Sequence, residues 1–411
     1  MSLVLVGVGS ELQSFEVDVE TGEARRLARI DLGLNPQYAC WHPDRPVLYV
    51  AASSRKDATR PGARHEAVAV AVNELTGSLG ELGERATLPD RPNHVYCSEG
   101  GDLLALSIPG TSCVRLSPIE RGGALGKGES TTLSTPSHTH QVRATPRGDH
   151  LIAVSRGNPS SPGWWAHKGR QREPGAISIL GRQGGQWHER EVAVVGDGYD
   201  FGPRHVEFHP SSRWMYVSVE TQNEVMAFQW SETAPHLELV QRLSTLTDDD
   251  RTLVHHGAGA IHVHPRGHVV YVSNRSHKSV PHRDGSKSLR EGLHENSLLV
   301  FAVDPASGTL TLRQRIDSGG VCPRTFSIDP SGRLLVVANA ESRWWSGPRS
   351  RLQGANLTSF RVHDDGRLSP LECTELDGHD GARAIWSGIY PRSRGENRVP
   401  SYAYDVAVMA P

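Results

Sequence analysis

The strongest constraint on the fold of this chain is a short motif that recurs along it: an alternating apolar segment, a turn and a second apolar segment. The clearest copy lies in residues 202–219, where Val206 and Phe208 alternate with polar residues and are followed by turn residues at 209–212. The next segment, 214–219, is apolar and rich in aromatic residues. An alternating segment and an apolar, aromatic-rich segment on the two sides of a turn predict two antiparallel strands, which we label A and B.

Two further segments complete the repeating unit. Residues 224–230 alternate at period two and predict a strand C, and residues 237–243 predict a strand D. Each unit should therefore form one four-stranded antiparallel sheet.

Other copies of the A-turn-B motif recur at a regular spacing along the chain. They occupy residues 38–50, 94–106, 142–154, 260–272 and 326–337, and in the copy at 94–106 the turn Ser98-Glu99-Gly100-Gly101 replaces the usual His-Pro type. One repeat is about 57 residues long, so the 411 residues hold about seven of them. Repeated sheets of this length predict an all-β fold, a seven-bladed β-propeller that uses residues 1–411 as a single domain.

The chain ends should close the ring, because pairing the two termini in one blade removes exposed sheet edges. Residues 3–8, 12–17 and 26–30 are typical of strands B, C and D with no strand A before them. We predict that the missing strand A comes from the C-terminus, with Tyr402–Met409 as our choice and Ala384–Tyr390 as the competing segment.

Composition restricts the partners and the compartment. The formal net charge of −2 argues against nucleic acid or an acidic membrane surface as the main partner. The five cysteines have neither disulfide nor metal-ligand spacing. Because residues 1–9 lack a basic segment and a cleavage-like site, and because no apolar run approaches about 18 residues, we expect a cytoplasmic protein without a membrane span.

The two faces of the predicted propeller differ. Strands A and B are antiparallel, so the D-to-A and B-to-C loops share one face, and the A-to-B and C-to-D turns share the other. The turn face carries short turns of similar sequence, whereas long insertions rich in Arg, His and Trp occupy B-to-C loops at residues 53–64, 157–174, 276–295 and 342–354. We expect the functional site on this decorated face.

Polar residues gather at strand ends on the decorated face, where strands A line the central channel. They are His138, His140, Arg204, His205, Glu220, Asn274, Arg275 and Arg324, and His256 lies near the channel mouth. Guanidinium groups bind carboxylate or phosphate and can stabilise an oxyanion. Histidine can move a proton near neutral pH, and a glutamate can do the same where burial raises its pKa. We predict a small acidic substrate.

Structural readings compete with functional ones. The repeated His-Pro turns containing His42, His209 and His264 lie on the undecorated face, so we interpret them as structural. The pairs His138/His140 and His262/His264 have strand spacing that a metal could use, but no cysteine or carboxylate partner has ligand spacing, so we predict no metal. Tryptophans on the insertions, among them Trp164 and Trp345, can either stack on a substrate or pack the loops together.

These residues also carry a family resemblance. Residues 137–142 (Ser-His-Thr-His-Gln-Val), 202–210 (Gly-Pro-Arg-His-Val-Glu-Phe-His-Pro), 271–275 (Tyr-Val-Ser-Asn-Arg) and 323–330 resemble, in order, motifs of the seven-bladed propeller lactonase family, which includes 6-phosphogluconolactonases and muconate lactonizing enzymes. The resemblance covers the chain to about residue 362 and implies a cofactor-independent enzyme that opens or forms a lactone.

The family pattern implies that His140, Arg204, Glu220 and Arg275 form the catalytic site. The chain departs from the pattern at Ser155-Arg156-Gly157, where the family tends to carry Asp-x-Gly, and at Val219, where it often has asparagine. Three hypotheses follow: hydrolysis of a lactone, with His140 or Glu220 activating water; cycloisomerisation of an unsaturated polycarboxylate; or a non-catalytic propeller that binds a partner through its loops.

Overall fold

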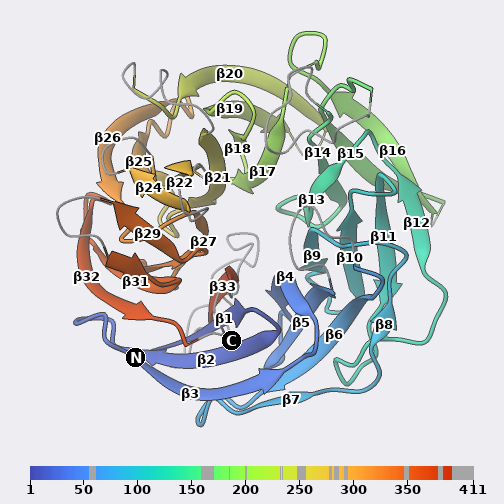
Figure 1. The fold of residues 1–411 in the computed structure, drawn as a ribbon. Coiled ribbons are helices and arrows are strands. Elements are labelled where there is room, and N and C mark those ends of the chain that lie inside the picture. Colours follow the sequence, from blue (N-terminus) through green and yellow to red (C-terminus); the bar gives the residue numbers. More distant parts are fainter. Residues whose placement is uncertain are drawn as a thin grey trace.

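A computed structural model shows a ring of β-sheets arranged around a central axis, along which strands A lie (Figure 1). It describes residues 1–54, 62–158, 171–247 apart from 185, 200, 232 and 234, 256–276, 280–281, 287–290, 295–346, 351–377 and 383–390. Among these residues no helix is long and apolar enough to cross a membrane. The all-β, seven-bladed propeller with four-stranded antiparallel blades is confirmed.

Each blade runs from an innermost strand A to an outermost strand D. Blade 1 contains β33 (Ala384–Tyr390), β1 (Ser2–Val8), β2 (Glu11–Val17) and β3 (Ala24–Asp31). Blade 2 contains β4 (Asn35–Trp41), β5 (Val47–Ser53), β6 (His65–Val72) and β7 (Leu79–Glu81), with β8 (Ala86–Thr87) paired to β6. Blade 3 contains β9 (His94–Cys97), β10 (Leu103–Ile108), β11 (Cys113–Pro118) and β12 (Thr131–Ser134). Blade 4 contains β13 (Thr139–Ala144), β14 (His150–Ser155), β15 (Ala176–Gln183) and β16 (Gln186–Ala193). Blade 5 contains β17 (Pro203–Phe208), β18 (Trp214–Val219), β19 (Glu224–Ser231) and β20 (His236–Ser244). Blade 6 contains β21 (His256–Val263), β22 (Val269–Ser276), β25 (Ser297–Val303) and β26 (Leu310–Asp317). Blade 7 contains β27 (Pro323–Ile328), β28 (Leu334–Asn339), β31 (Asn356–Val362) and β32 (Leu368–Glu375).

The ring closes through the segment that we ranked second. β1 pairs with β33, from Leu3 opposite Tyr390 to Val8 opposite Ala384, so the C-terminal strand supplies strand A as expected. Our choice of residues 402–409 was therefore wrong, and those residues lie outside the described part of the chain. Trp386 is fully buried in β33, and the ring of Tyr390 lies 4.6 Å from that of Trp41 in blade 2. This apolar packing holds β33 in the ring.

Turn histidines fasten neighbouring blades on the undecorated face. Nδ1 of His209 and of His264 accepts the backbone N–H of the residue two positions later, at 3.0 and 3.1 Å. With Nδ1 accepting, the neutral ring donates from Nε2 to a glycine carbonyl of the next blade, Gly267 at 2.8 Å and Gly332 at 3.0 Å. Burial lowers the pKa of both rings, which favours this neutral form. These contacts between blades support the prediction that His209 and His264 are structural.

Replacing Gly267 by alanine should destabilise the protein by about 2 kcal/mol or more. Its φ is +77°, and an added Cβ would lie 2.5 Å from Nε2 of His209. Gly148 occupies the same turn position with φ +74°, but an added Cβ meets nothing within 4 Å. Gly148→Ala should therefore cost only the backbone strain, about 1 kcal/mol. Urea unfolding of both variants checks the difference, and equal losses would contradict the proposed contact.

Tyrosines form a second set of contacts between blades. The hydroxyls of Tyr49, Tyr216 and Tyr271, all in strand B of their blades, donate to carbonyl oxygens in C-to-D turns of the next blade. The acceptors are Gly123 at 2.8 Å, Gly308 at 3.1 Å and Gly366 at 2.7 Å. All three side chains are fully buried, so these bonds satisfy hydroxyls that would otherwise be costly to bury.

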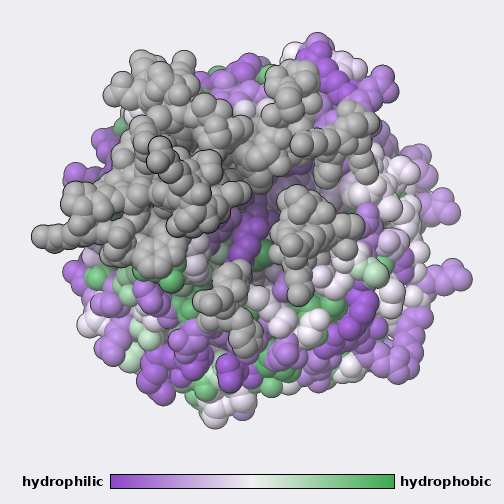
Figure 2. All heavy atoms as spheres, in the orientation of Figure 1, coloured by the Kyte–Doolittle hydropathy of each residue, from purple (hydrophilic) through white to green (hydrophobic). Residues whose placement is uncertain are grey.

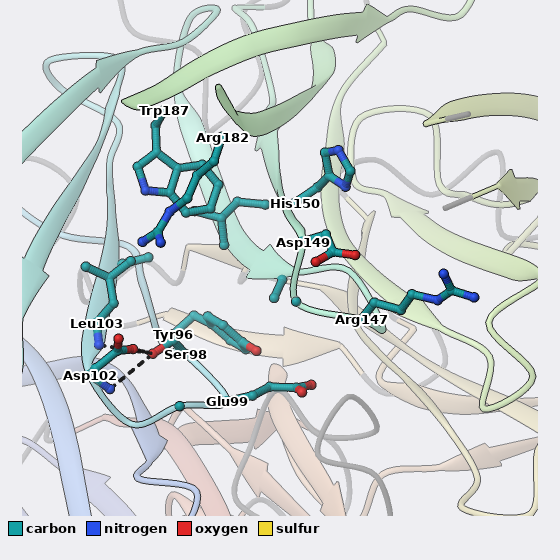
Figure 3. A pocket seen from close by; sticks show the side chains of 15 residues that line it. Tyr96, Ser98, Glu99, Asp102, Leu103, Arg147, Asp149, His150, Arg182 and Trp187 are labelled. Atoms are coloured by element: carbon teal, nitrogen blue, oxygen red, sulfur yellow. Dashed lines mark hydrogen bonds between the residues drawn. The ribbon is translucent and has the colours of Figure 1, made fainter. Parts of the chain in front are cut away.

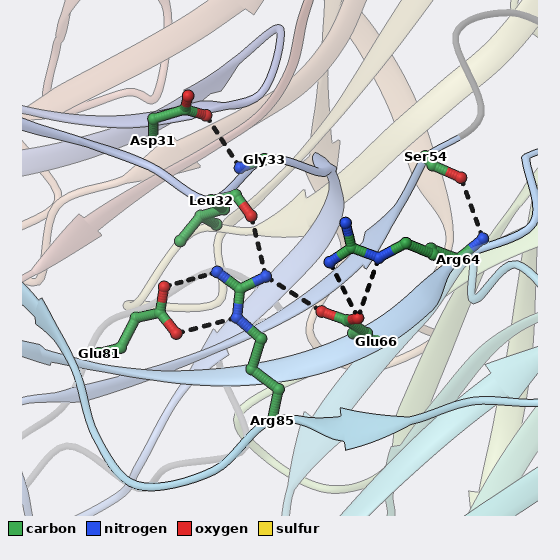
Figure 4. Close-up of polar contacts among 8 residues, drawn as sticks. All are labelled: Asp31, Leu32, Gly33, Ser54, Arg64, Glu66, Glu81 and Arg85. Carbon is green, nitrogen blue, oxygen red and sulfur yellow. Dashed lines mark hydrogen bonds and ion pairs between the residues drawn. The ribbon is translucent and has the colours of Figure 1, made fainter.

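Blades 1 and 2 are also joined by an arginine on the outside of the ring (Figure 4). Arg85 follows β7 and forms a two-pronged ion pair with Glu81, with Nε 2.9 Å and Nη2 2.5 Å from the carboxylate oxygens. Its Nη1 donates to the carbonyl of Leu32, which precedes β4, at 2.9 Å, and to Glu66 in β6 at 3.0 Å. One planar guanidinium therefore connects three segments of the chain.

The insertions lie in the predicted B-to-C connections. Those of blades 6 and 7 contribute to a separate sheet of β23 (Val280–Pro281), β24 (Lys287–Arg290), β29 (Arg343–Ser346) and β30 (Arg351–Gln353). In this sheet β24 pairs in parallel with β29. Two insertions that are far apart in sequence thus meet on the decorated face.

Candidate active site

Three charged residues occupy the same place in three consecutive blades. Arg156 directly follows β14, and Glu220 directly follows β18. Their backbone N–H groups bond to equivalent carbonyls before strand A, those of His138 at 3.1 Å and Gly202 at 2.8 Å. Arg275, near the end of β22, lies opposite Gly257, which has the equivalent place in blade 6. The repeat therefore brings a carboxylate between two guanidiniums.

Glu220 is the centre of this group. Its Oε1 is ion-paired with Nη2 of Arg275, and its Oε2 accepts a bond from Nη1 of Arg156 at 3.2 Å. Nε of Arg204 lies 3.8 Å from the same oxygen. Glu220 is only 1% exposed, and this burial raises its pKa, but the three positive charges outweigh burial and lower the pKa to about 2. The carboxylate is therefore ionised at neutral pH.

A second layer of the site lies at bulges near the start of the innermost strands. The strand register shifts between Thr139 and Gln141, between Pro203 and His205, and between Pro323 and Thr325. The extra residues at these bulges are His140, Arg204 and Arg324. A bulge redirects one side chain relative to the regular ladder, and bulges are common beside active sites. The same irregularity thus positions three of the predicted site residues.

His140 is buried among positive charges. Burial, with a further contribution from Arg204 and the other arginines, holds the pKa of its imidazole well below the usual range. The ring is therefore neutral at pH 7 and has a lone pair that can accept a proton. Its Nδ1 is buried and has no hydrogen-bond partner among the described residues. The imidazole can therefore act as a base, and no second group among the described residues stabilises its protonated form.

Positive charge accumulates around His140. Burial and the charge of Arg275 lower the pKa of Arg324 to about 10, and burial lowers the pKa of Arg204. Four guanidiniums, those of residues 156, 204, 275 and 324, act on His140, and three of them also act on the Glu220 carboxylate. An incoming anion would relieve this excess of positive charge.

Aromatic rings form a third layer beneath the arginines. The ring of His205 lies 5.1 Å from that of His140 and 5.9 Å from that of Tyr38. Tyr38 lies in turn 4.1 Å from the ring of His94. These residues come from the innermost strands of blades 2 to 5. They form a group of neighbouring rings contributed by four consecutive blades.

Deeper in the channel lies a buried ion pair that is distinct from this site. Glu207 accepts from Nη1 of Arg143 at 2.7 Å, and its other oxygen lies 3.2 Å from Nδ1 of His262. All three side chains are at most 4% exposed. The imidazole of His262 in β21 is therefore held by the Glu207 carboxylate of β17. Among the described residues, no group of three or more His, Cys, Asp or Glu could hold a metal ion.

The structure brings together most of the predicted site residues. A chain of pairwise contacts joins His140 to His205, His205 to Arg204, and Glu220 to both Arg204 and Arg275, and the charge of Arg324 acts on His140. In the view of Figure 2, the described surface near the centre of the ring is largely hydrophilic. The predicted convergence at one end of the channel is therefore present.

Other predicted residues have different positions. Asn274 is fully buried and donates to the carbonyl of Thr245 at 2.5 Å, as Asn339 does to Ser318 at 2.8 Å one blade later, so we assign it to holding the D-to-A connection. His138 precedes β13 with φ +60°. The backbone of His256 opens β21 and that of Trp345 lies in β29. Their side chains, and all of Trp164, lie outside the described residues.

Sequence reasoning missed Arg156, Tyr38 and His94 as site residues. In the sequence, Arg156 is visible only as part of a departure from the family pattern. Its equivalence to Glu220 across repeats, one residue after strand B, was the signal that could have found it. Tyr38 and His94 occupy the position of His205 in blades 2 and 3, so the same alignment of repeats would have identified them.

Comparisons with known proteins agree with this architecture. A family model described as "Lactonase, 7-bladed beta-propeller" matches residues 5–160 and 180–346. A 6-phosphogluconolactonase of Bacillus subtilis is 27% identical over 381 residues, which cover 89% of this chain and 92% of that protein. A 6-phosphogluconolactonase of Pectobacterium atrosepticum is 26% identical over 270 residues, covering 65% and 69%.

Solved structures show the same fold. A chain from Bacteroides uniformis superposes with a TM-score of 0.70 at 20% identity and covers 94% of this chain and 99% of its own length. The periplasmic gluconolactonase of Pseudomonas aeruginosa superposes with a TM-score of 0.67 at 22% identity, covering 94% and 98%. At this level of identity the likeness concerns the fold.

Proposed function

Because the chain belongs to the seven-bladed β-propeller lactonase family, we propose that it is a lactonase that hydrolyses the cyclic ester of an acidic sugar. The 6-phosphogluconolactonases among its relatives make a phosphorylated aldonolactone the first substrate to test. A lactone from aromatic breakdown is the second class. The proposal includes no cofactor.

One observation carries the proposal: a neutral, buried imidazole faces an excess of guanidinium groups. Ester hydrolysis needs a base that is unprotonated at working pH and a positive environment for the oxyanion. His140 meets the first need, because burial keeps its pKa low. Arg204 and Arg275 meet the second, and Glu220 fixes both by ion pairs. Arg324 remains to bind the acidic group of the substrate.

The proposed reaction proceeds in two steps. His140 accepts a proton from water while the water oxygen forms a bond to the lactone carbonyl carbon, and the negative charge that develops on the carbonyl oxygen is stabilised by Arg204 and Arg275. The ring C–O bond then breaks, and the protonated His140 returns its proton to the departing ring oxygen. The products are the open acid and a neutral imidazole. Glu220 stays ionised throughout, since a base with a pKa of about 2 is too weak to activate water.

A panel of lactones tests this proposal. We expect release of acid, followed with a pH indicator, from phosphorylated or carboxylated lactones and at least tenfold lower kcat/KM for neutral lactones of the same ring size. The neutral lactones serve as the matched control for the cationic pocket. Absence of turnover above the uncatalysed rate for every lactone would reject hydrolysis and favour a binding propeller.

Cycloisomerisation is the second candidate, favoured by the number of guanidiniums. Arg156 adds a fourth cation near Glu220, enough to hold two carboxylates of an unsaturated acid while one adds across the double bond. Mixing the protein with muconate and carboxymuconate should then remove their ultraviolet absorbance. An unchanged spectrum together with lactone hydrolysis would leave hydrolysis as the function.

A further inference from the structure

A cavity of about 600 Å³ lies between blades 3 and 4, on the turn face opposite the candidate active site. Its apolar lining includes Leu103, Ala105 and Leu151, and Tyr96 and Trp187 add aromatic surface. Figure 3 shows Trp187 and Arg182 facing, across the gap, the turn that carries Ser98 and Asp102. This volume lies within the usual range for small-molecule sites.

The cavity arises where the first contact between blades is missing. Ser98 occupies the position of the turn histidines in the degenerate repeat. Its hydroxyl supports its own turn, accepting from the N–H of Leu103 at 3.0 Å and donating to Asp102 at 2.7 Å, but it is too short to reach the next blade. Gly148 stands where a histidine ring would arrive, and an added Cβ there meets nothing within 4 Å. At Gly101 the equivalent Cβ would lie 2.5 Å from the ring of His42.

The second contact is missing at the same seam. Ala105 of β10 occupies the position held by Tyr49, Tyr216 and Tyr271 in other blades, and it lines the cavity. The seams between blades 2 and 3, 5 and 6, and 6 and 7 each contain one histidine and one tyrosine contact. The seam between blades 3 and 4 lacks both side chains, and the space they would fill is open.

Three other seams lack the pair but are filled differently. Between blades 1 and 2, the ring of Tyr390 lies 4.6 Å from that of Trp41, and its hydroxyl donates to the Glu74 carboxylate at 2.5 Å. Between blades 4 and 5, large apolar residues such as Phe208, Met215 and Trp230 form a buried cluster with blade 4. Between blades 7 and 1, Arg333 is ion-paired with Glu20 and Arg361 donates to the Glu20 carbonyl at 2.7 Å. The cluster next to the cavity includes three alanines, Ala105, Ala144 and Ala153. A bound molecule would fill the remaining space and complete the packing between blades 3 and 4.

The seams that contain both contacts indicate which kind of molecule would fit. In those seams the corresponding space holds an imidazole, which donates to the carbonyl of an A-to-B turn, and a phenol, which donates to the carbonyl of a C-to-D turn. We propose that the cavity between blades 3 and 4 binds a small planar aromatic molecule with a ring N–H or a phenolic O–H. Its ring packs against Tyr96 and Trp187, and its donor bonds to the carbonyl oxygen of Gly148. The guanidinium of Arg182, 4.9 Å from the Trp187 ring, holds that indole in place.

Side-chain analogues provide the probes. We expect 4-methylimidazole and 4-methylphenol to bind saturably in ligand-observed saturation-transfer NMR, and to raise Tm by about 1–2 °C at tenfold excess over Kd. Cyclohexanol, which has a donor but no aromatic ring, should not bind. The variant Ser98→His/Ala105→Tyr should abolish binding of both probes and raise Tm, because it restores the contacts of the other seams. Ser98→Thr, which copies Thr145 of the next blade, should leave binding intact.

A crystal soaked with 4-iodophenol gives an answer that does not depend on how the variants fold. Anomalous density between Ser98 and Gly148 is the expected result. Density only at the channel mouth, unchanged binding in a folded double variant, or no saturable binding of either probe would each overturn the proposal.

Discussion

Replacing Glu220 by glutamine should reduce kcat/KM by about 10²-fold or more and destabilise the fold by about 3–5 kcal/mol. Glutamine keeps the shape but removes the charge that holds Arg156, Arg204 and Arg275. The arginines would then repel one another in a buried site and lose the positions from which they stabilise the oxyanion. Steady-state kinetics and urea unfolding measure the two effects.

The pH dependence of stability adds a specific signature for Glu220. Its pKa is about 2 in the folded protein and 4.5 as the ordinary value, so the ionised form is favoured by folding. The stabilisation is complete above about pH 4.5 and is lost as the pH falls toward 2. Wild type should therefore lose stability over this window more steeply than Glu220→Gln. Equal slopes for the two proteins would contradict the ion-pair assignment.

Glu207 provides the matched control. It lies in the same blade, is equally buried and pairs with Arg143, but it belongs to the deeper cluster of the channel. Glu207→Gln should also destabilise the protein by about 3–5 kcal/mol, yet change kcat/KM much less than Glu220→Gln does. If both variants lost activity equally, loss of folded protein and not loss of the site would explain the result.

The repeat made the overall architecture predictable from the sequence, whereas the roles of individual positions were harder to predict. The A-turn-B motif predicted the blade, the ring and the face of the insertions, because period-two alternation and turns are local properties. Closure was mispredicted, because the choice between two C-terminal strands depends on packing of Trp386 and Tyr390 against distant residues.

The candidate site shows the same division between local and spatial information. The positions of His140 and Arg204 near the channel followed from strand ends, but their bulges are visible only in the register of paired strands. The role of Glu220 also changed. Burial alone would raise its pKa and suit it to proton transfer, and only the three surrounding guanidiniums, which come from different blades, reverse that direction. Sequence spacing carries no information on such a balance.

Replacing His140 by asparagine should lower kcat by about 10²–10⁴-fold with a much smaller change in KM, because the base acts on water and the arginines bind the substrate. His209→Asn is the control, since it removes an equally buried histidine from a turn on the opposite face. That variant should lose stability and keep kcat. Stopped-assay kinetics on folded protein, checked by circular dichroism, separates the two.

The pH profile then distinguishes His140 from Glu220 as the base. Because the pKa of His140 lies well below 6.5, the acid limb of kcat/KM should lie below pH 6.5 in wild type, with activity falling as the pH drops through it. With Glu220 as the base, the limb would lie near pH 2 and persist in His140→Asn. Loss of the limb in His140→Asn supports the imidazole, and its persistence there would assign the base to another group.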